Sequence, residues 1–303
     1  MTIDLAAASA FMTTHARLLD RRRFGVRFAG AEPGPALAAL EAYRNPDGGY
    51  GALEPDLRAP ESQPAGALHA FEVFGDITTA TSPRAAELCD WLATATLGDG
   101  GLPFALPIAD ATATAPFWAQ ADPTTSSLHI TTAVAAVAHR VARRDPAVAG
   151  HPWLARVTDY CLGTIAGQGA ASSTLELRYA LGFLDAVVES RPDAAPLLDR
   201  WAASLPASAT LPVEGGLEDE VIRPLEFAPF PGRPVREHVA PEVVEADLDR
   251  LAGEQHPDGG WDVDYTSYSP AAALEWRGYV TVHALSILQA NGRVHVPEPS
   301  AAG

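Results

Sequence analysis

The stretch that decides the fold is Gln255-His256-Pro257-Asp258-Gly259-Gly260-Trp261, because related phrases recur along the chain. Three other copies, at 43–51, 97–103 and 213–217, are also centred on a Gly-Gly pair. Proline presets φ, aspartate bonds its own backbone and paired glycines tolerate positive φ, so the phrase predicts a tight turn. Recurrence at a period of about 50 residues is typical of stacked supersecondary units.

Helical patterns flank these turns. Apolar residues recur at helical spacing in 134–141, 177–184 and 244–251, and 279–288 is apolar enough to form a helix buried on most sides. We expect roughly six helix pairs joined by Gly-rich turns, arranged as an open solenoid or a closed ring. The wide gap between the second and third copies leaves room for a degenerate unit around 167–169.

The charge balance excludes several classes of function. The 303 residues include 38 acidic and 21 basic side chains, for a net charge of −17, which disfavours nucleic acid as a partner. The only compact basic run is Arg21-Arg22-Arg23. The chain contains no lysine, so Schiff-base and Walker-type lysine mechanisms are excluded.

The chain is expected to form one domain over 1–295, with a Pro-rich irregular loop at about 212–240 and a disordered tail at 296–303. Cys89 and Cys161 lie far apart in helical patterns and are expected to be small buried hydrophobes. No apolar run approaches the ~20 residues of a membrane span, and a cytoplasmic protein is expected.

The segment 255–261 resembles the Gln-Trp repeat of squalene–hopene cyclases, and 45–50 resembles a weaker copy of it. This resemblance to the terpenoid-cyclase and protein prenyltransferase superfamily implies an all-α fold, an α/α toroid of inner and outer helices around a hydrophobic central cavity. It further implies acid catalysis on an isoprenoid or another hydrophobic small molecule, with no cofactor, or with Mg²⁺ if the substrate is a diphosphate. The alternatives are a non-catalytic lipid- or peptide-binding toroid and a sugar-active α/α-toroid enzyme.

Three acidic segments precede expected inner helices, so their side chains should converge at one mouth of such a ring. The first contains Glu54, Asp56, Arg58 and Glu61 in a Pro-rich stretch. We interpret Asp56 as a candidate proton donor or ion ligand and the other three as candidate substrate contacts. The alternative is an ordinary helix start, with proline in the first turn.

The second segment contains Trp118 and Asp122. Class II terpene cyclases carry an Asp-x-Asp-Asp-Thr signature at a comparable helix start, and only Asp122 could correspond to it here. Asp122 is therefore a candidate proton donor and Trp118 a candidate substrate contact, although Asp122 could instead cap the following helix.

The third segment contains Asp262, Asp264 and Tyr265 and leads to Trp276 and Arg277. The two aspartates alternate, so in an extended loop they would point the same way and could hold an ion or a proton, with Asp264 as the catalytic candidate. Tyr265 and Trp276 could stabilise a carbocation, and Arg277 could bind an anionic head group. The aromatic residues could equally be packing anchors.

Glu176 and Phe227 complete the candidate substrate contacts. Glu176 is expected to pair with Arg178, to face the cavity or to be solvated, and Phe227 to cover the mouth or to brace the outer surface. The histidines at 69, 129, 139 and 283 lack a partnering histidine or cysteine at ligand spacing. Because the prenyltransferase zinc cysteine is also missing, no metal is expected.

Overall fold

The computed structural model describes residues 3–218, 220–265 and 267–295. Within this part the chain is almost entirely helical, and its only named strands are the antiparallel pair β1 (Leu211–Pro212) and β2 (Val221–Ile222). The expected all-α class is confirmed. None of the described helices is both long and apolar enough to cross a membrane. The predicted tail at 296–303 lies outside the described residues.

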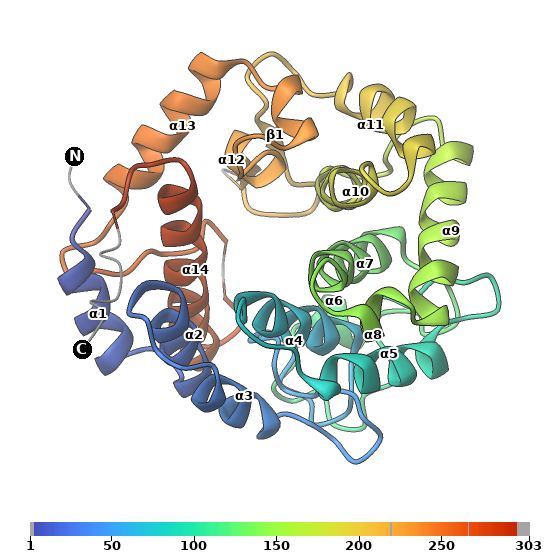
Figure 1. The fold of residues 1–303 in the computed structure, drawn as a ribbon, viewed down its shortest axis with the longest axis horizontal. Coiled ribbons are helices and arrows are strands. Elements are labelled where there is room, and N and C mark those ends of the chain that lie inside the picture. Colours follow the sequence, from blue (N-terminus) through green and yellow to red (C-terminus); the bar gives the residue numbers. More distant parts are fainter. Residues whose placement is uncertain (1–2, 219, 266, 296–303) are drawn as a thin grey trace.

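Figure 1 shows the helices in two rows around a common centre. The outer row consists of α1 (Leu5–Thr14), α3 (Gly34–Glu41), α5 (Pro83–Ala95), α9 (Pro152–Gly167), α11 (Ala195–Ala202) and α13 (Pro241–Gly253). The inner row consists of α2 (Leu18–Phe28), α4 (Pro64–Asp76), α7 (Leu128–Ala142), α10 (Thr174–Val187), α12 (Pro224–Phe227) and α14 (Pro270–Ala290). Short elements lie between these helices: α6 (Pro116–Ala119), α8 (Pro146–Ala149), and the 3₁₀ turns η1 (Pro192–Ala194) and η2 (Pro234–His238).

Caps and prolines explain where the inner helices begin. The hydroxyls of Ser127, Ser173 and Ser269 accept from the first-turn amides of α7, α10 and α14. Proline occupies the first position of α4, α12 and α14, where its missing N–H costs no helical hydrogen bond. These caps and prolines therefore fix where the connections from the outer row end and the inner helices begin.

Three of the four Gly-Gly phrases form the same turn between an outer and an inner helix. In each, the aspartate carboxylate accepts from the second glycine amide, at 3.0 Å in 45–49, 3.1 Å in 97–101 and 3.0 Å in 256–260. The first glycine has positive φ in all three, at 94°, 102° and 96°. The phrase at 213–217 instead lies between β1 and β2, and 168–173 connects α9 to α10.

The second glycine of each turn provides room for an aromatic ring from the next outer helix. A Cβ on Gly49 would lie 2.5 Å from the Trp91 ring, and one on Gly101 would lie 2.5 Å from the Tyr160 ring. Such approaches are too close for any side chain but hydrogen. The repeat therefore encodes both a turn and the docking of the following outer helix.

The last turn uses the first helix for the same purpose. A Cβ on Gly260 would lie 2.9 Å from the ring of Phe11 on α1. The Gln255 side chain also accepts from the Asp4 amide and donates to the Asp4 carbonyl, both at 2.9 Å. The two ends of the described chain therefore meet through the same kind of contact that joins its successive hairpins (Figure 1).

The Pro-rich segment at 212–240 is more regular than the predicted irregular loop. It contains β2, α12 and η2, which pack on α10, α11 and α13. Phe227 is 1% exposed and belongs to the core. Neither a cover over the mouth nor a brace on the outer surface describes it, because α12 takes the inner place of its helix pair (Figure 1).

Candidate functional site

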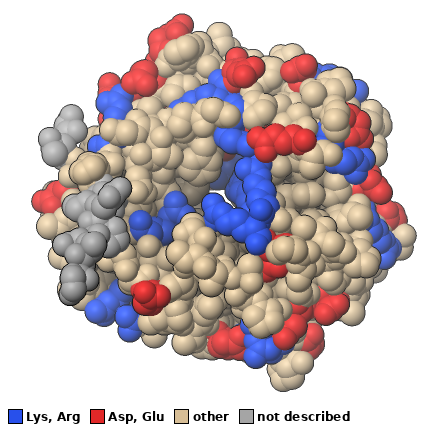
Figure 2. All heavy atoms as spheres, viewed as in Figure 1, with Lys and Arg blue, Asp and Glu red and all other residues tan. Residues whose placement is uncertain are grey.

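The centre of the molecule is hollowed in the space-filling view (Figure 2). Glu72, Arg178, Tyr279 and His283 are half-buried side chains of α4, α10 and α14, three helices of the inner row that surrounds this centre. These side chains are charged, polar or aromatic. They do not provide the hydrophobic lining that the family resemblance implies.

An imidazole bridged by two carboxylates forms the centre of the candidate site. His69 on α4 lies with Nε2 2.7 Å from Oε2 of Glu54 and with Nδ1 3.0 Å from Oε2 of Glu72. Tyr279 on α14 donates its hydroxyl to Oε1 of Glu72 at 2.8 Å. The loop before α4, α4 itself and α14 thus place four polar side chains in one hydrogen-bonded chain.

The charges of this chain determine the protonation states of its members. Burial alone would lower the pKa of His69, but Glu72 and Glu54 outweigh it and raise that pKa to about 9. Burial would raise the pKa of Glu72, but His69 and then Arg23 lower it to about 2. At neutral pH the site therefore holds an imidazolium beside an ionised carboxylate.

Aromatic rings surround this ion pair. The rings of Trp276 and Tyr279 meet edge to face at 5.4 Å, Tyr265 meets Trp276 at 5.5 Å, and His69 meets Tyr279 at 5.1 Å. Burial, followed by the carboxylates of Glu54 and Asp56, raises the pKa of Tyr265, which remains a phenol. The α14 side of the hollow therefore presents ring faces and edges together with hydrogen-bonding groups.

Two neutral imidazoles contrast with His69. His283 stacks on Tyr279 at 6.4 Å, and His129 stacks on Tyr179 of α10 at 4.6 Å. Burial, followed by the nearby Arg178 guanidinium, lowers the pKa of each to about 4. At neutral pH, His69 is therefore a protonated acid, whereas His129 and His283 are neutral bases.

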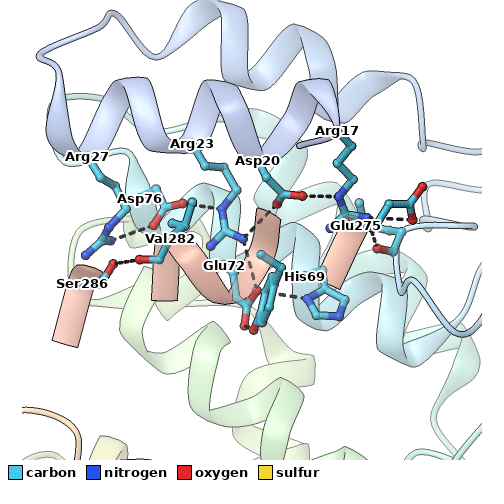
Figure 3. A network of polar contacts seen from close by, with 12 residues as sticks. Arg17, Asp20, Arg23, Arg27, His69, Glu72, Asp76, Glu275, Val282 and Ser286 are labelled. Atoms are coloured by element: carbon cyan, nitrogen blue, oxygen red, sulfur yellow. Dashed lines mark hydrogen bonds and ion pairs between the residues drawn. The ribbon is translucent and has the colours of Figure 1, made fainter. Parts of the chain in front are cut away.

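A buried ion network supports the site from α2 (Figure 3). Arg23 donates through Nε to Asp76 at 2.7 Å, and Arg27 donates to the other oxygen of Asp76 at 2.8 Å. The Arg23 guanidinium also lies 3.7 Å from the Glu72 carboxylate. Burial would lower the pKa of Arg23, but Asp76, Glu72 and Asp20 raise it above its usual value. Charge on α2 therefore helps to keep Glu72 ionised.

Asp56 lies beside this site and joins two of the predicted acidic segments. Its carboxylate accepts from the Tyr268 amide at 2.8 Å and from the Trp276 indole at 2.7 Å. Arg58 lies 2.6 Å from Glu275 of α14. The structure thus brings Asp56 to Trp276 and Glu54 to His69, while Glu61 accepts from the Ala109 amide farther out in the loop.

The other two catalytic candidates lie elsewhere. Asp122 is exposed and accepts from the Thr124 amide and hydroxyl and from the Thr125 hydroxyl. These hydrogen bonds lower its pKa to about 2, which suits a turn residue and not a proton donor. Asp122 does not cap α7 either, because the N-cap residue of that helix is Ser127. Asp264 is 45% exposed and lies 3.2 Å from Arg223.

The remaining aspartate and the expected anion-binding arginine hold the last Gly-Gly turn in place. Asp262 and Asp264 do not share an ion site, since Asp262 pairs with Arg277 and His256. Arg277 also donates two bonds of 3.0 Å to Asp258. Its donors are thus occupied by the turn, which assigns Arg277 a structural role.

Glu176 and Trp118 also have structural contacts. Glu176 is 7% exposed and accepts from the Ser172 amide at 2.8 Å, so it is not solvated. Arg178 pairs with Glu226 at 3.3 Å and not with Glu176. Trp118 stacks on Phe104 at 4.3 Å, and Phe104 in turn packs against His129 of α7.

The sequence analysis missed the residues at the centre of this site. His69 was considered only as a possible zinc ligand, and Glu72, Tyr279 and Arg23 were not considered as site residues. One signal was available, because His69 and Glu72 are an i, i+3 pair on one face of a helix. No cluster that could hold a metal ion occurs among residues 3–218, 220–265 and 267–295.

An open pocket of about 500 Å³ lies at the loop that leads into α14. Its lining includes Tyr265 and Tyr268, the residues whose side chain and amide contact Trp276 and Asp56. The pocket therefore adjoins the aromatic side of the candidate site.

Comparison with known proteins supports the fold alone. No protein-family model matches the chain, and no curated protein matches it. Among solved structures, the chain is similar to one described as a protein from Actinoplanes, with a TM-score of 0.55 and 15% sequence identity. The match covers 95% of this chain and 100% of that chain. At 15% identity, the similarity shows a shared fold and gives no information about the activity of this chain.

Proposed function

We propose that the protein is an α/α toroid whose central hollow binds a sugar-like, polyhydroxylated small molecule and catalyses proton transfer on it. The toroid is supported by the two rows of helices and by the contact between the last turn and α1 (Figure 1). The function rests on one observation: the Glu54–His69–Glu72 chain lies against the aromatic rings of Trp276 and Tyr279.

The substrate class is inferred from the lining. A hydrocarbon chain beside Glu72, Arg178 and His283 would remove these groups from water without replacing their hydrogen bonds, which is costly. A sugar offers hydroxyls to the charged groups and C–H faces to rings such as Trp276 and Tyr279. The lining therefore favours the sugar-active alternative over a hydrophobic substrate.

The reaction class is inferred from protonation states that differ between neighbouring groups. The His69 imidazolium and the Tyr279 hydroxyl are proton donors, and the neutral His283 ring, stacked on Tyr279, is an acceptor. Donor and acceptor thus both contact the ring of Tyr279. Such a pair serves epimerisation, elimination or acid-assisted cleavage at a sugar carbon.

An isoprenoid cyclase remains the second proposal, and one observation favours it. The rings of Tyr265, Trp276 and Tyr279 cluster edge to face, and clustered rings can stabilise a carbocation. The weaker part of this proposal is the first step, the protonation of an alkene. An imidazolium with a pKa of about 9 is far too weak an acid to protonate an alkene, and Glu72 is ionised.

A substrate panel separates the two proposals. Neutral and acidic sugars and prenyl diphosphates would each be tested for binding by calorimetry and for conversion by mass spectrometry. We expect a sugar to bind and to be converted. Conversion of a prenyl diphosphate with no sugar bound would overturn the proposal, as would failure of every sugar to bind. Binding of a sugar without conversion would support a non-catalytic toroid instead.

Tyr279→Phe tests the assigned chemistry once a substrate is found. The variant loses only the hydroxyl that donates to Glu72, and we expect turnover to fall by roughly 100-fold, as for loss of an acid–base group. Tyr160→Phe on the outer helix α9 is the matched control and should turn over like the parent protein. Equal turnover of both variants would exclude Tyr279 from the reaction.

A further inference from the structure

Arg140, near the end of α7, is the basic side chain around the hollow whose donors are least engaged. Among the described residues it has no ion pair and no hydrogen-bonded partner, although a guanidinium carries five N–H donors. It is more exposed to solvent than Glu72 and His283, and the charges that act on it include Glu72 of the candidate site and Asp185 of α10. It therefore faces a space that water can enter.

The acidic groups near Arg140 already have partners. Asp185 accepts from Arg233 at 2.9 Å and from the Val235 amide at 3.0 Å. Glu189 accepts from Arg233 at 2.8 Å and lies 3.3 Å from Arg143.

The deeper carboxylates are paired as well. Asp76 accepts from Arg23 and Arg27, and Glu72 from His69 and Tyr279. In the described part of the chain, the carboxylates of Glu72, Asp76, Asp185 and Glu189 are therefore all engaged by other partners.

The surrounding charge is positive although the protein is strongly acidic. Burial lowers the pKa of Arg140, and the like charges of Arg143 and Arg233 lower it further, against the opposing effect of Asp185 and Glu72. On the face shown in Figure 2, basic side chains gather around the central hollow and acidic ones lie mostly farther out. A concave site lined by one sign of charge concentrates ions of the opposite sign.

We propose that Arg140 binds an oxyanion, a carboxylate or phosphate carried by the small molecule that occupies the hollow. The proposal rests on the proposed function in that both place one ligand there, and it narrows the substrate to an acidic or phosphorylated sugar. An oxyanion would use the unengaged donors of Arg140 through charge-assisted bonds and relieve its repulsion by Arg143 and Arg233.

The experiment compares four probes: glucose, glucuronate, glucose 6-phosphate and inorganic phosphate. Binding of each is measured by calorimetry at low ionic strength for the parent protein, Arg140→Gln and Arg22→Gln. Arg22 on α2 is the control, because it is also an exposed arginine with no ion pair among the described residues. We expect an anionic probe to bind the parent at least 10-fold more tightly than glucose does, and to lose at least 10-fold in Arg140→Gln.

Folding of the variant should not confound the result. Arg140 has no partner to leave unpaired, so Arg140→Gln should melt at the parent temperature or slightly above it. Glucuronate and glucose 6-phosphate distinguish a carboxylate from a phosphate as the source of the oxyanion.

The outcomes separate this inference from the proposed function. Anion binding that Arg140→Gln leaves unchanged would overturn the inference, as would glucose binding as tightly as the anions. Either result would leave a sugar site in place. Inorganic phosphate binding that depends on Arg140, with no sugar bound, would support the anion site and overturn the sugar-binding proposal.

Discussion

Gly259→Ala will destabilise the protein by about 3 to 5 kcal/mol, measured as the free energy of unfolding in denaturant. Gly259 has a φ of +96°, and a Cβ there would lie 2.1 Å from the carbonyl carbon of Ala7 on α1. Backbone strain at positive φ accounts for about 1 kcal/mol of the loss. The remainder comes from the overlap with α1, which no side-chain rotation can relieve.

Gly215→Ala is the matched control for this prediction. Gly215 has a φ of +77°, but a Cβ there would meet nothing within 4 Å. It reports the backbone strain alone, about 1 kcal/mol. If the two variants lost the same stability, the last turn would not pack against α1 in solution, and the contact that joins the ends of the chain would be absent.

Asp76→Asn will cost about 3 to 5 kcal/mol of stability, because it leaves the buried Arg23 and the half-buried Arg27 without their shared carboxylate. Asparagine has nearly the shape of aspartate, so the loss reports charge and not packing. Thermal and denaturant unfolding measure it. Arg23 would retain only the more distant Glu72 and Asp20, at 3.7 and 3.9 Å.

The matched control for Asp76→Asn is Glu245→Gln, which removes one partner of the exposed Arg293. Exposed ion pairs contribute little, so this variant should stay within about 0.5 kcal/mol of the parent protein. Equal behaviour of the two variants would mean that water reaches Arg23 and Arg27 freely. The buried network on α2 would then not support the site.

The repeated turn was the most predictable feature of the molecule because its information is local. An aspartate followed by two glycines defines one hydrogen-bonding pattern, and Asn45, Leu97 and His256 open the same turn at three places. Helical periodicity likewise gave the all-α class. The packing role of the second glycine could not be predicted from the local sequence, because it depends on the rings of Trp91 and Tyr160, which lie far along the chain.

The candidate site depends on contacts that no local pattern encodes. Tyr279 reaches Glu72 across 207 residues, and Trp276 reaches Asp56 across 220. The basic run Arg21-Arg22-Arg23 shows the same limit, because two of its members are exposed while Arg23 is buried beside Asp76. Adjacent residues on a helix face different directions, so a run of charge does not reveal which member is buried.

The hydrophobic cavity was expected by analogy of fold, and fold does not determine the lining of a site. The loops that precede α4 and α14 do meet, as the hydrogen bond from the Tyr268 amide to Asp56 shows. Polar residues on the inner faces of α4 and α14 were overlooked because a helix that is apolar overall can still carry one polar position per turn. His69 and Tyr279 occupy such positions.

The protonation state of His69 is the most direct test of an acid–base site in the hollow. Long-range ¹H–¹⁵N spectra of histidine-labelled protein, assigned with His69→Gln, would be recorded from about pH 5 to about pH 10. The account predicts a His69 imidazolium that loses its proton near pH 9, while His129 and His283 stay neutral throughout, consistent with pKa values of about 4. A His69 that titrates near the ordinary value of about 6.5 would contradict the account, because the ring would then not be held as an imidazolium between Glu54 and Glu72.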